Sequence, residues 1–259
     1  MIVISVANQK GGSGKTTTAV SVASWLAMKD RKTLLIDMDP QSNSTMCLTD
    51  PTVIQSKTSI GALLNDEASL KDVIQTNRYI PKLDFIPATL DLSITELDLG
   101  HLSTGGILLK QRLEELGEKD YSYVICDCPP NFGVMTVNAV HASSLLLVPM
   151  EPETFAFYGL EMFMSSLVPR MKKFVNKNFS LLGIVLTRVN PIRTLTQNVR
   201  LELMRRYKRL LFATEIPVDV RLPESAAAHQ PICIFAGRSK SAQAYEQLTD
   251  EIMNRIEST

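Results

Sequence analysis

Residues 8–17 read Asn-Gln-Lys-Gly-Gly-Ser-Gly-Lys-Thr-Thr and directly follow an apolar run at residues 2–7. Glycines in such a turn let successive backbone N–H groups point at phosphate oxygens, and the start of a following helix adds the positive end of its dipole. Apolar residues recur at helical spacing after the turn, which predicts a helix over residues 16–28. Strand, glycine-rich turn and helix together predict a loop that binds the phosphates of a nucleotide.

Two side chains of this loop have predicted chemical roles. We expect Lys15 to reach the β- and γ-phosphates, and the Thr16 hydroxyl to ligate the Mg²⁺ that bridges them. The loop departs from the standard pattern, because Gln9 stands where that pattern has its first glycine. The predicted nucleotide-binding residues of the loop are Lys10, Gly11, Gly12, Ser13, Gly14, Lys15, Thr16 and Thr17.

Length and composition predict one large α/β domain over residues 1–259. The chain has 259 residues and a formal net charge of zero, and no Pro/Gly/Ser-rich linker divides it. It has neither a signal-peptide pattern nor an apolar run of about 18 residues, so we expect a cytoplasmic protein that binds no membrane. Its four cysteines lack the paired spacing of a zinc site, and we expect them to stay reduced.

The order of apolar segments predicts a doubly wound, mostly parallel sheet with helices on both faces. Runs such as residues 145–148 are apolar without alternation, which is typical of strands buried on both faces. The predicted strands are residues 2–7, 33–37, 83–87, 121–127, 145–149 and 181–187. The clearest predicted helices are residues 16–28, 107–116, 155–168, 197–207 and 242–256.

Three carboxylates stand where predicted strands end. Asp37 and Asp39 close the strand that begins at residue 33, and Asp127 closes the strand that begins at residue 121. Because ligands of open α/β sheets bind at the carboxyl ends of the strands, we expect these side chains to lie beside the phosphate loop. Asp127 has the position of a Walker B aspartate, which holds Mg²⁺ through water; a helix cap is the structural alternative.

Lys10 and residues 37–41 carry a family resemblance. A lysine before the glycine pair is the signature of the deviant Walker A loop, so the chain resembles the ParA/MinD group of dimerising ATPases. The sequence Asp-Met-Asp-Pro-Gln at residues 37–41 looks like switch I of the ParA/Soj-type partition ATPases. The resemblance extends from Ile2 to about Ile252, although Asn131 stands where the family more commonly has serine.

The resemblance implies an ATPase that uses ATP and Mg²⁺. Lys10 is expected to act in catalysis with Lys15, by reaching the partner's phosphates in a nucleotide-sandwich homodimer. Asp39 is expected to position or activate the attacking water, and Asp37 to support the Mg²⁺ shell together with Thr16 and Asp127. The weaker candidates for contacts with adenine are Asn190, Pro217, Val218 and Asp219.

The resemblance also implies binding to double-stranded DNA without sequence preference. Between Met162 and Lys240 there are 14 Lys and Arg residues against 4 Asp and Glu residues, and ordinary scatter of solvated charges is the alternative explanation. The candidate DNA-binding residues are Arg193, Arg221, Arg238 and Lys240. The dense basic cluster at residues 205–209 fits a solvated helix face equally well. Val218-Asp219 replaces an Arg-Asn pair that the family often carries, which predicts a weaker or displaced DNA patch.

The expected partners are DNA, a second copy of the chain and a centromere-binding ParB-like protein that stimulates hydrolysis on the nucleoid. Three alternatives remain at this stage. The same cycle could position a protein cargo, or the chain could be a MinD-like membrane-cycling ATPase, although residues 246–259 are balanced to acidic rather than basic. For an iron–sulfur reductase, Cys126 and Cys128 are expected on opposite faces of their strand, which disfavours a shared cluster.

Overall fold

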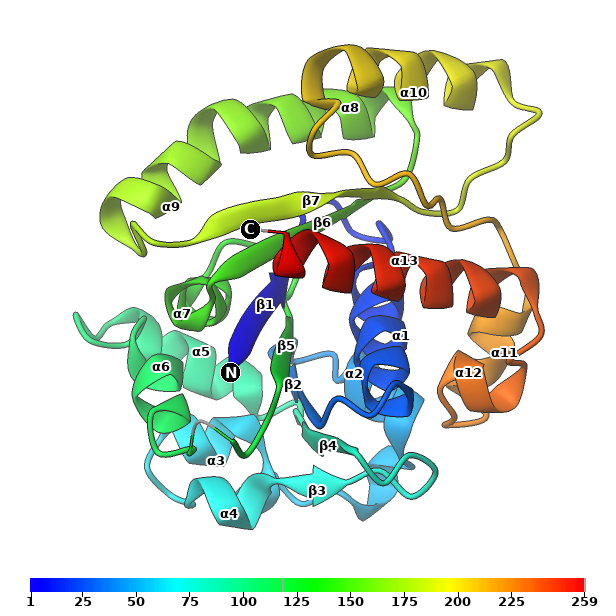
Figure 1. The fold of residues 1–259 in the computed structure, drawn as a ribbon. Helices are drawn as coiled ribbons and strands as arrows, with labels where there is room; N and C mark the ends of the chain where they lie inside the picture. Colours follow the sequence, from blue (N-terminus) through cyan, green and yellow to red (C-terminus); the bar gives the residue numbers. More distant parts are fainter. Residues whose placement is uncertain (118, 259) are drawn as a thin grey trace.

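Seven strands form one sheet within residues 1–117 and 119–258, the part of the chain that the computed structural model describes (Figure 1). The strand order is β3-β4-β2-β5-β1-β6-β7, and every neighbouring pair is parallel except β3 with β4. The strands are β1 (Ile2–Val6), β2 (Thr33–Asp37), β3 (Gln75–Thr76), β4 (Leu83–Ile86), β5 (Tyr123–Asp127), β6 (Leu145–Met150) and β7 (Ser180–Leu186).

Helices cover both faces of this sheet, as the sequence predicts (Figure 1). Crossovers from one parallel strand to the next require such connections, and the helices bury the two faces. The helices are α1 (Lys15–Met28), α2 (Asn43–Leu48), α3 (Ile60–Leu64), α4 (Leu70–Val73), α5 (Leu92–Gly100), α6 (Leu108–Leu113), α7 (Val134–Ala142), α8 (Thr154–Met162), α9 (Val168–Phe174), α10 (Thr194–Tyr207), α11 (Arg221–Ala227), α12 (Ile232–Phe235) and α13 (Lys240–Glu257).

Two hydrophobic cores lie on opposite faces of the sheet. On β5, Val124 and Cys126 belong to the core covered by α3 and α5 to α10, whereas Tyr123 and Ile125 belong to the core covered by α1 and α13. Successive residues of a strand point to opposite faces, so a strand between two cores must be apolar throughout. This double burial explains why the predicted strands show no alternation.

The predicted boundaries differ from the structure mainly at helix ends. The helix predicted at residues 155–168 is longer, because α8 continues through a π-helical segment, Phe163–Leu167, into α9. The helix predicted at residues 107–116 is shorter and spans Leu108–Leu113. The elements α2 to α5, α7, α11 and α12 and the edge strand β3 were not predicted, and most of them have too few residues to show a period.

The last helix packs on the sheet. Tyr245, Leu248 and Ile252 of α13 are buried in the core that contains α1, and the Tyr245 and Thr18 hydroxyls lie 3.2 Å apart. The apolar stripe of α13 is therefore used inside the protein, as expected from its flanking charges. Within the described residues, none of the helices has the length and apolar character needed to cross a membrane.

Candidate functional site

The carboxyl ends of β1, β2 and β5 bring the predicted site residues together. Asp127 is in register with Val6 of β1 on one side and with Asp37 of β2 on the other, and the phosphate loop follows β1 directly. Asp37, Asp39 and Asp127 are all buried. The prediction that these three carboxylates lie beside the loop is confirmed, because neighbouring parallel strands end at the same edge.

The loop backbone has the conformation that its glycines allow. Gly12 and Gly14 have φ values of 74° and 82°, a left-handed region that residues with a Cβ rarely adopt, and α1 begins directly afterwards at Lys15. The Thr187 hydroxyl donates to the Ser13 carbonyl at 2.9 Å, and Asn8 Nδ2 donates to the Pro149 carbonyl at 2.7 Å. The ends of β6 and β7 thereby hold the loop at the helix N-terminus, where an anion is favoured.

The two lysines of the loop have different surroundings. Lys15 is buried, and its Nζ donates to the Lys10 carbonyl at 3.1 Å. Burial lowers the pKa of Lys15, and the nearby charges of Asp127 and Asp39 act in the opposite direction. Lys10 is part-exposed and forms an ion pair with Glu153, which precedes α8. Lys15 therefore faces the carboxylates, whereas Lys10 lies at the rim.

Asp127 offers one free oxygen at this site. Its Oδ2 accepts a 2.6 Å hydrogen bond from the Ser44 hydroxyl, whereas Oδ1 has no partner within the described residues. Burial raises the pKa of Asp127, and the hydroxyls of Ser44 and Thr16 act to lower it. Thr16 and Asp127, predicted as metal ligands from distant parts of the chain, are thus neighbours.

Asp37 and Asp39 differ in how their oxygens are used. Asp37 Oδ2 accepts from the Thr45 N–H and hydroxyl, both at 2.8 Å, and Oδ1 accepts from the Asp39 N–H at 3.1 Å. Burial and the Asp127 charge raise the pKa of Asp37. Asp39 accepts from the Gln41 N–H at 2.9 Å through Oδ1, and its Oδ2 has no hydrogen bond from the residues that the structure describes. Asp37 therefore shapes the segment at residues 37–45, and Asp39 keeps an oxygen available.

These groups fit a magnesium ion. Mg²⁺ prefers hydroxyl and carboxylate oxygens and retains several waters. The Thr16 hydroxyl lies beside the buried Asp127 carboxylate. Asp127 Oδ1 and the Ser13 hydroxyl are buried atoms without a hydrogen-bond partner among residues 1–117 and 119–258. Asp37 has both oxygens engaged by the protein, so its predicted support of the metal shell acts through the geometry of its segment.

The adenine candidates lie on two adjoining segments. Val189 and Pro217 pair as an isolated bridge, which places Asn190 beside residues 217–219. Val189, Pro191 and Pro217 line a pocket of about 370 Å³ together with residues of α13. Asp219 uses its oxygens within the protein, because they accept from the Arg221 N–H and from the Ser241 N–H and hydroxyl. The adenine contacts remain predictions.

The four DNA candidates are exposed: Arg221 and Lys240 begin α11 and α13, Arg238 lies two residues before α13, and Arg193 directly precedes α10. Asp219 links the starts of α11 and α13, and Lys240 lines the same pocket as Pro191, two residues before Arg193. Arg221 pairs with Glu224 at 2.8 Å, whereas no ion pair forms at Arg193, Arg238 or Lys240 within the described part of the chain. Arg193, Arg238 and Lys240 are therefore exposed cations without an ion pair in the described part of the chain.

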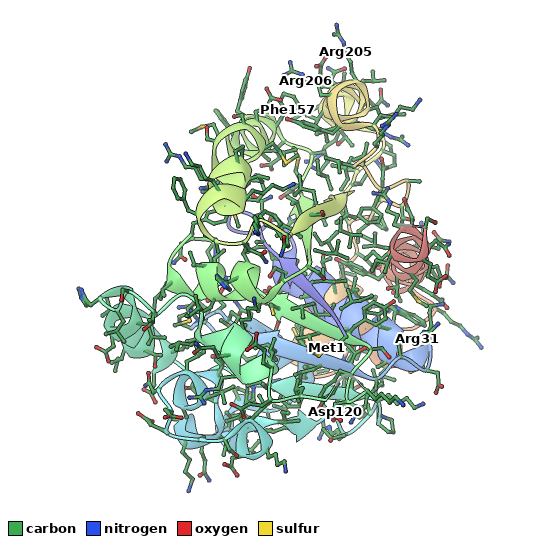
Figure 2. All side chains as sticks on the ribbon, turned by 60° about the vertical axis from the view of Figure 1, so that its left-hand side comes forward. Met1, Arg31, Asp120, Phe157, Arg205 and Arg206 are labelled. Atoms are coloured by element: carbon green, nitrogen blue, oxygen red, sulfur yellow. The ribbon has the colours of Figure 1, made fainter. Side chains whose placement is uncertain are left out.

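The basic cluster at residues 205–209 is a separate surface. Arg205 and Arg193 are separated by about 18 Å along α10 at the usual helical rise. Figure 2 shows Arg205 and Arg206 near Phe157, and Arg206 bonds to Glu161 at 2.6 Å and lies 5.4 Å from the Phe157 ring. Arg205 and Arg206 both pair with Glu202. Because Arg205 and Arg206 are paired with carboxylates of the protein, the cluster fits the interpretation as a solvated helix face.

The expected placement of two cysteines is wrong. Cys126 and Cys128 belong to the same core, on the same face of the sheet, because residues two positions apart in extended chain share a face. Both thiols are nonetheless fully buried, and burial raises the pKa of Cys126 to about 12 and also raises that of Cys128. Buried, protonated thiols are poor ligands for a cluster shared between subunits.

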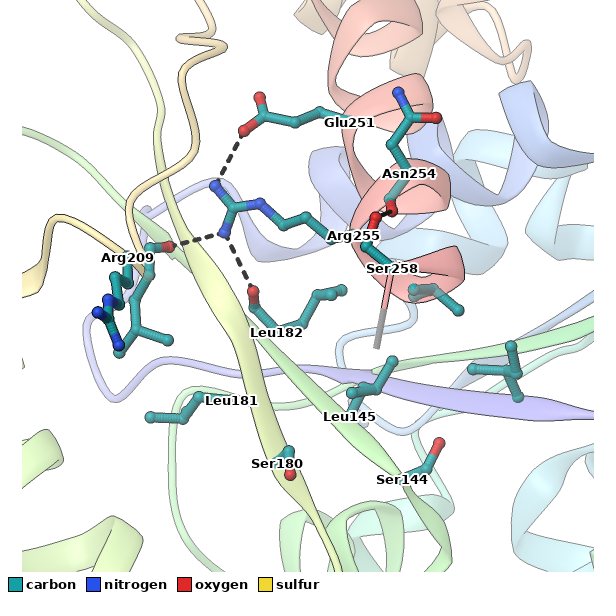
Figure 3. Close-up of a pocket in the computed structure, with 13 residues that line it drawn as sticks. Ser144, Leu145, Ser180, Leu181, Leu182, Arg209, Glu251, Asn254, Arg255 and Ser258 are labelled. Atoms are coloured by element: carbon teal, nitrogen blue, oxygen red, sulfur yellow. Dashed lines mark hydrogen bonds and ion pairs between the residues drawn. The ribbon is translucent and has the colours of Figure 1, made fainter.

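A larger pocket lies away from this site. It measures about 690 Å³ and is lined by the amino ends of β1, β6 and β7 and by the last turns of α13 (Figure 3). Arg255 crosses it and donates to Glu251 and to the carbonyls of Leu182, Leu210 and Leu211. These bonds join α13 to β7, so we assign the side chain of Arg255 to the fold.

Sequence reasoning missed several residues that position the site. They are Ser44 and Thr45 beside the carboxylates, Glu153 beside Lys10, and Thr187 beside the loop. Only the hydroxyls at residues 44–45 carried a sequence signal, since they follow the acidic segment at residues 37–39. Glu153 and Thr187 approach the loop through contacts that span 143 and 174 residues.

Comparison with known proteins agrees with this arrangement. A family described as an AAA domain matches residues 1–181. The chain is 33% identical over 250 residues to the sporulation initiation inhibitor protein Soj of Bacillus subtilis, covering 96% of this chain and 97% of Soj. It is 35% identical over 254 residues to the chromosome partitioning protein ParA of Myxococcus xanthus, and the match covers 98% of this chain and 88% of ParA.

A solved structure is similar throughout. The cobyrinic acid a,c-diamide synthase of Mycobacterium smegmatis, solved with a bound ATP analogue and magnesium, superposes with a TM-score of 0.84 at 30% identity. The match covers 100% of this chain and 96% of that one. The matches to Soj and ParA extend over nearly the full length of this chain. The chain belongs to the Soj/ParA family of chromosome-partitioning proteins.

Proposed function

We propose that this protein is a partitioning ATPase that binds ATP with Mg²⁺. The observation that carries the proposal is the free oxygen of Asp127, buried beside Thr16 and near the Lys15 charge. Thr16 and Asp127 would hold the ion, which supplies positive charge to the developing phosphate charges. Lys15 adds a further cation from the start of α1.

Hydrolysis of ATP requires the protein mainly to position the attacking water and to stabilise charge, without a covalent intermediate. Asp39 accepts one hydrogen bond from its own segment and keeps its other oxygen for a water, which it orients for attack on the γ-phosphate. Asp37 holds this segment by bonding to Thr45 and to the Asp39 N–H. Residues 37–41 of this chain would then position the attacking water.

The functional unit is proposed to be an ATP-dependent homodimer. Lys10 lies at the rim of the loop, with its side chain one-third exposed, where it can reach phosphates on a second copy. Beside Glu153, helix α8 exposes an apolar stripe of Phe155, Tyr158 and Met162, and Phe155 is 86% exposed. A second subunit that covers this rim would bury the stripe together with the nucleotide.

DNA binding is proposed to follow dimerisation. The exposed cations Arg193, Arg238 and Lys240 neutralise phosphates without reading bases, and a dimer doubles their number. Binding through phosphates gives a salt-dependent affinity and association with the nucleoid in the cytoplasm. A ParB-like centromere-binding partner would then stimulate hydrolysis and release the dimer. Positioning of a protein cargo is the second candidate function. It would use the same cycle of ATP binding, dimerisation, DNA binding and stimulated hydrolysis.

Phosphate release from ATP tests the enzymatic part. We expect slow turnover that requires Mg²⁺, is stimulated by DNA together with the cognate ParB-like protein, and is lost in Asp39→Ala. Turnover that persists in Asp39→Ala would remove the proposed role of this carboxylate. Flotation with liposomes and ATP separates this protein from a MinD-like cycle, because the buried stripe of α13 predicts no membrane recruitment.

A further inference from the structure

Ser44 and Asp127 form a hydrogen bond that no part of the proposed cycle uses. The Ser44 hydroxyl donates to Asp127 Oδ2 at 2.6 Å across 83 residues of sequence, and both residues are fully buried. Ser44 lies in the first turn of α2, directly after the acidic segment. The bond therefore joins that segment to the end of β5 through one oxygen of the carboxylate, and the other oxygen has no hydrogen-bond partner among the described residues.

The hydrogen bond from Ser44 fixes the terminal torsion of the Asp127 side chain. The terminal torsion of an Asp side chain is broad, so burial alone does not select which oxygen faces the phosphate loop. Carboxylates that serve metals are usually hydrogen-bonded by a second layer of residues, which orients them. With Oδ2 held by Ser44, the free oxygen has a defined direction.

The neighbouring residue anchors α2 independently. The Thr45 N–H and hydroxyl donate to Asp37, and the Thr45 hydroxyl also accepts from the Ala88 N–H at 3.0 Å. Removal of the Ser44 hydroxyl leaves these three bonds in place. A variant at position 44 is therefore expected to fold and to keep α2 where it is.

The geometry points to Ser44 as a positioning residue for the magnesium site, whose hydroxyl holds Asp127 so that Oδ1 is presented to the ion beside Thr16. This inference rests on the proposed function, since it concerns the metal that Asp127 would serve. It also ties the orientation of Asp127 to the segment that carries Asp39. A change in that segment would then alter the metal site and the water position together.

Equilibrium binding of a fluorescent ATP analogue, titrated with Mg²⁺, tests this role without turnover. Ser44→Ala deletes the donor, and Ser44→Cys keeps the volume but offers only a weak donor. Loss of a second-layer partner typically weakens metal affinity by about 10–100-fold. Both variants are expected to shift the Mg²⁺ midpoint upward by roughly tenfold or more, with magnesium-free nucleotide binding unchanged.

Two controls make the outcomes distinct. Ser24→Ala removes a buried hydroxyl of α1 that lies beside Cys233 rather than beside Asp127, so its Mg²⁺ midpoint should equal that of the wild type. Asp127→Asn must shift the midpoint if Asp127 serves the metal. A shift in Asp127→Asn with wild-type midpoints in both Ser44 variants would overturn the inference alone. No shift in Asp127→Asn would overturn the proposed metal site and the inference with it.

Discussion

The Lys10 ammonium is paired with the Glu153 carboxylate, which comes from the connection between β6 and α8, 143 residues away. In the single chain the lysine therefore has an anionic partner in its own subunit. If Lys10 reaches the phosphates of a second subunit, it must exchange Glu153 for them. The ion pair and the dimer then compete for one side chain.

This competition predicts that Glu153→Gln promotes dimerisation. A part-exposed ion pair contributes about 0–1 kcal/mol, so the ATP concentration needed for half-maximal dimer formation should fall by up to about fivefold. Light scattering during an ATP titration measures the change. Glu151→Gln is the matched control, because Glu151 precedes Glu153 by two residues and pairs with Arg188 instead. Weaker dimerisation in Glu153→Gln would show that Glu153 supports the dimer.

Replacement of the two loop lysines should separate binding from assembly. Lys15→Ala removes a buried cation at the phosphates and should weaken ATP binding by about tenfold or more, because hydrogen bonds to charged groups contribute about 1.5–3 kcal/mol. Lys10→Ala should retain monomer binding of ATP and lose the dimer. Fluorescent nucleotide binding and light scattering measure the two properties. Equal losses of nucleotide affinity in both variants would contradict the different places of these lysines.

The buried carboxylates predict a pH dependence of stability. Burial raises the pKa values of Asp37 and Asp127 above those of the unfolded chain, so the folded state binds more protons between the unfolded and folded values. Their contribution to the free energy of unfolding therefore falls as pH rises through this window, and the full penalty is present above the folded pKa values. Without nucleotide or Mg²⁺, the melting temperature should reflect this loss between about pH 4 and 7.

Asp127→Asn isolates this effect from other titrating groups. It removes one charge and the repulsion that raises the pKa of Asp37, and it leaves groups such as His141 unchanged. The melting temperature of the variant should thus depend less steeply on pH than that of the wild type, by about 2–4 °C for each kcal/mol of penalty removed. Parallel pH profiles for the two proteins would contradict the proposed cost of the carboxylate pair.

Sequence patterns predicted the parts of the site that lie at strand ends. Asp37 and Asp127 could be placed together because a parallel sheet brings consecutive carboxyl ends to one edge, and the structure confirms their register. Gly12 and Gly14 could be placed because their chemistry demands a left-handed backbone. These predictions needed only the chain's local pattern and one rule of topology.

Other features depend on packing between distant segments. The partners of Ser44, Glu153 and Thr187 at the site lie at least 83 residues away in the sequence, so these contacts could not be predicted even where, as at Ser44, the residue follows the acidic segment. The faces of Cys126 and Cys128 could have been assigned from strand geometry, and the expectation was simply wrong. Pairing of Arg206 with Glu161 likewise appears only when α8 and α10 lie side by side.

We expect the cations near the start of α13 to contribute to DNA binding and the basic cluster on α10 not to contribute. Arg238→Ala and Lys240→Ala should each weaken binding to duplex DNA for all sequences and reduce the salt slope by about one. Arg205→Ala is the matched control on α10, where the arginine pairs with Glu202, and its affinity and slope should match the wild type. Fluorescence anisotropy across a salt series checks both. A larger loss in Arg205→Ala would move the DNA surface to α10.

ATP is proposed to switch DNA binding on by closing the dimer, and Asp39-dependent hydrolysis is proposed to switch it off. Binding to non-specific duplex DNA, measured with ATP, ADP or no nucleotide across a salt series, tests it most directly for the wild type and Asp39→Ala. The account predicts salt-sensitive binding that requires ATP and persists in Asp39→Ala, because that variant closes the dimer but cannot hydrolyse ATP. DNA binding that is absent in both proteins, or equal with ADP and ATP, would contradict it.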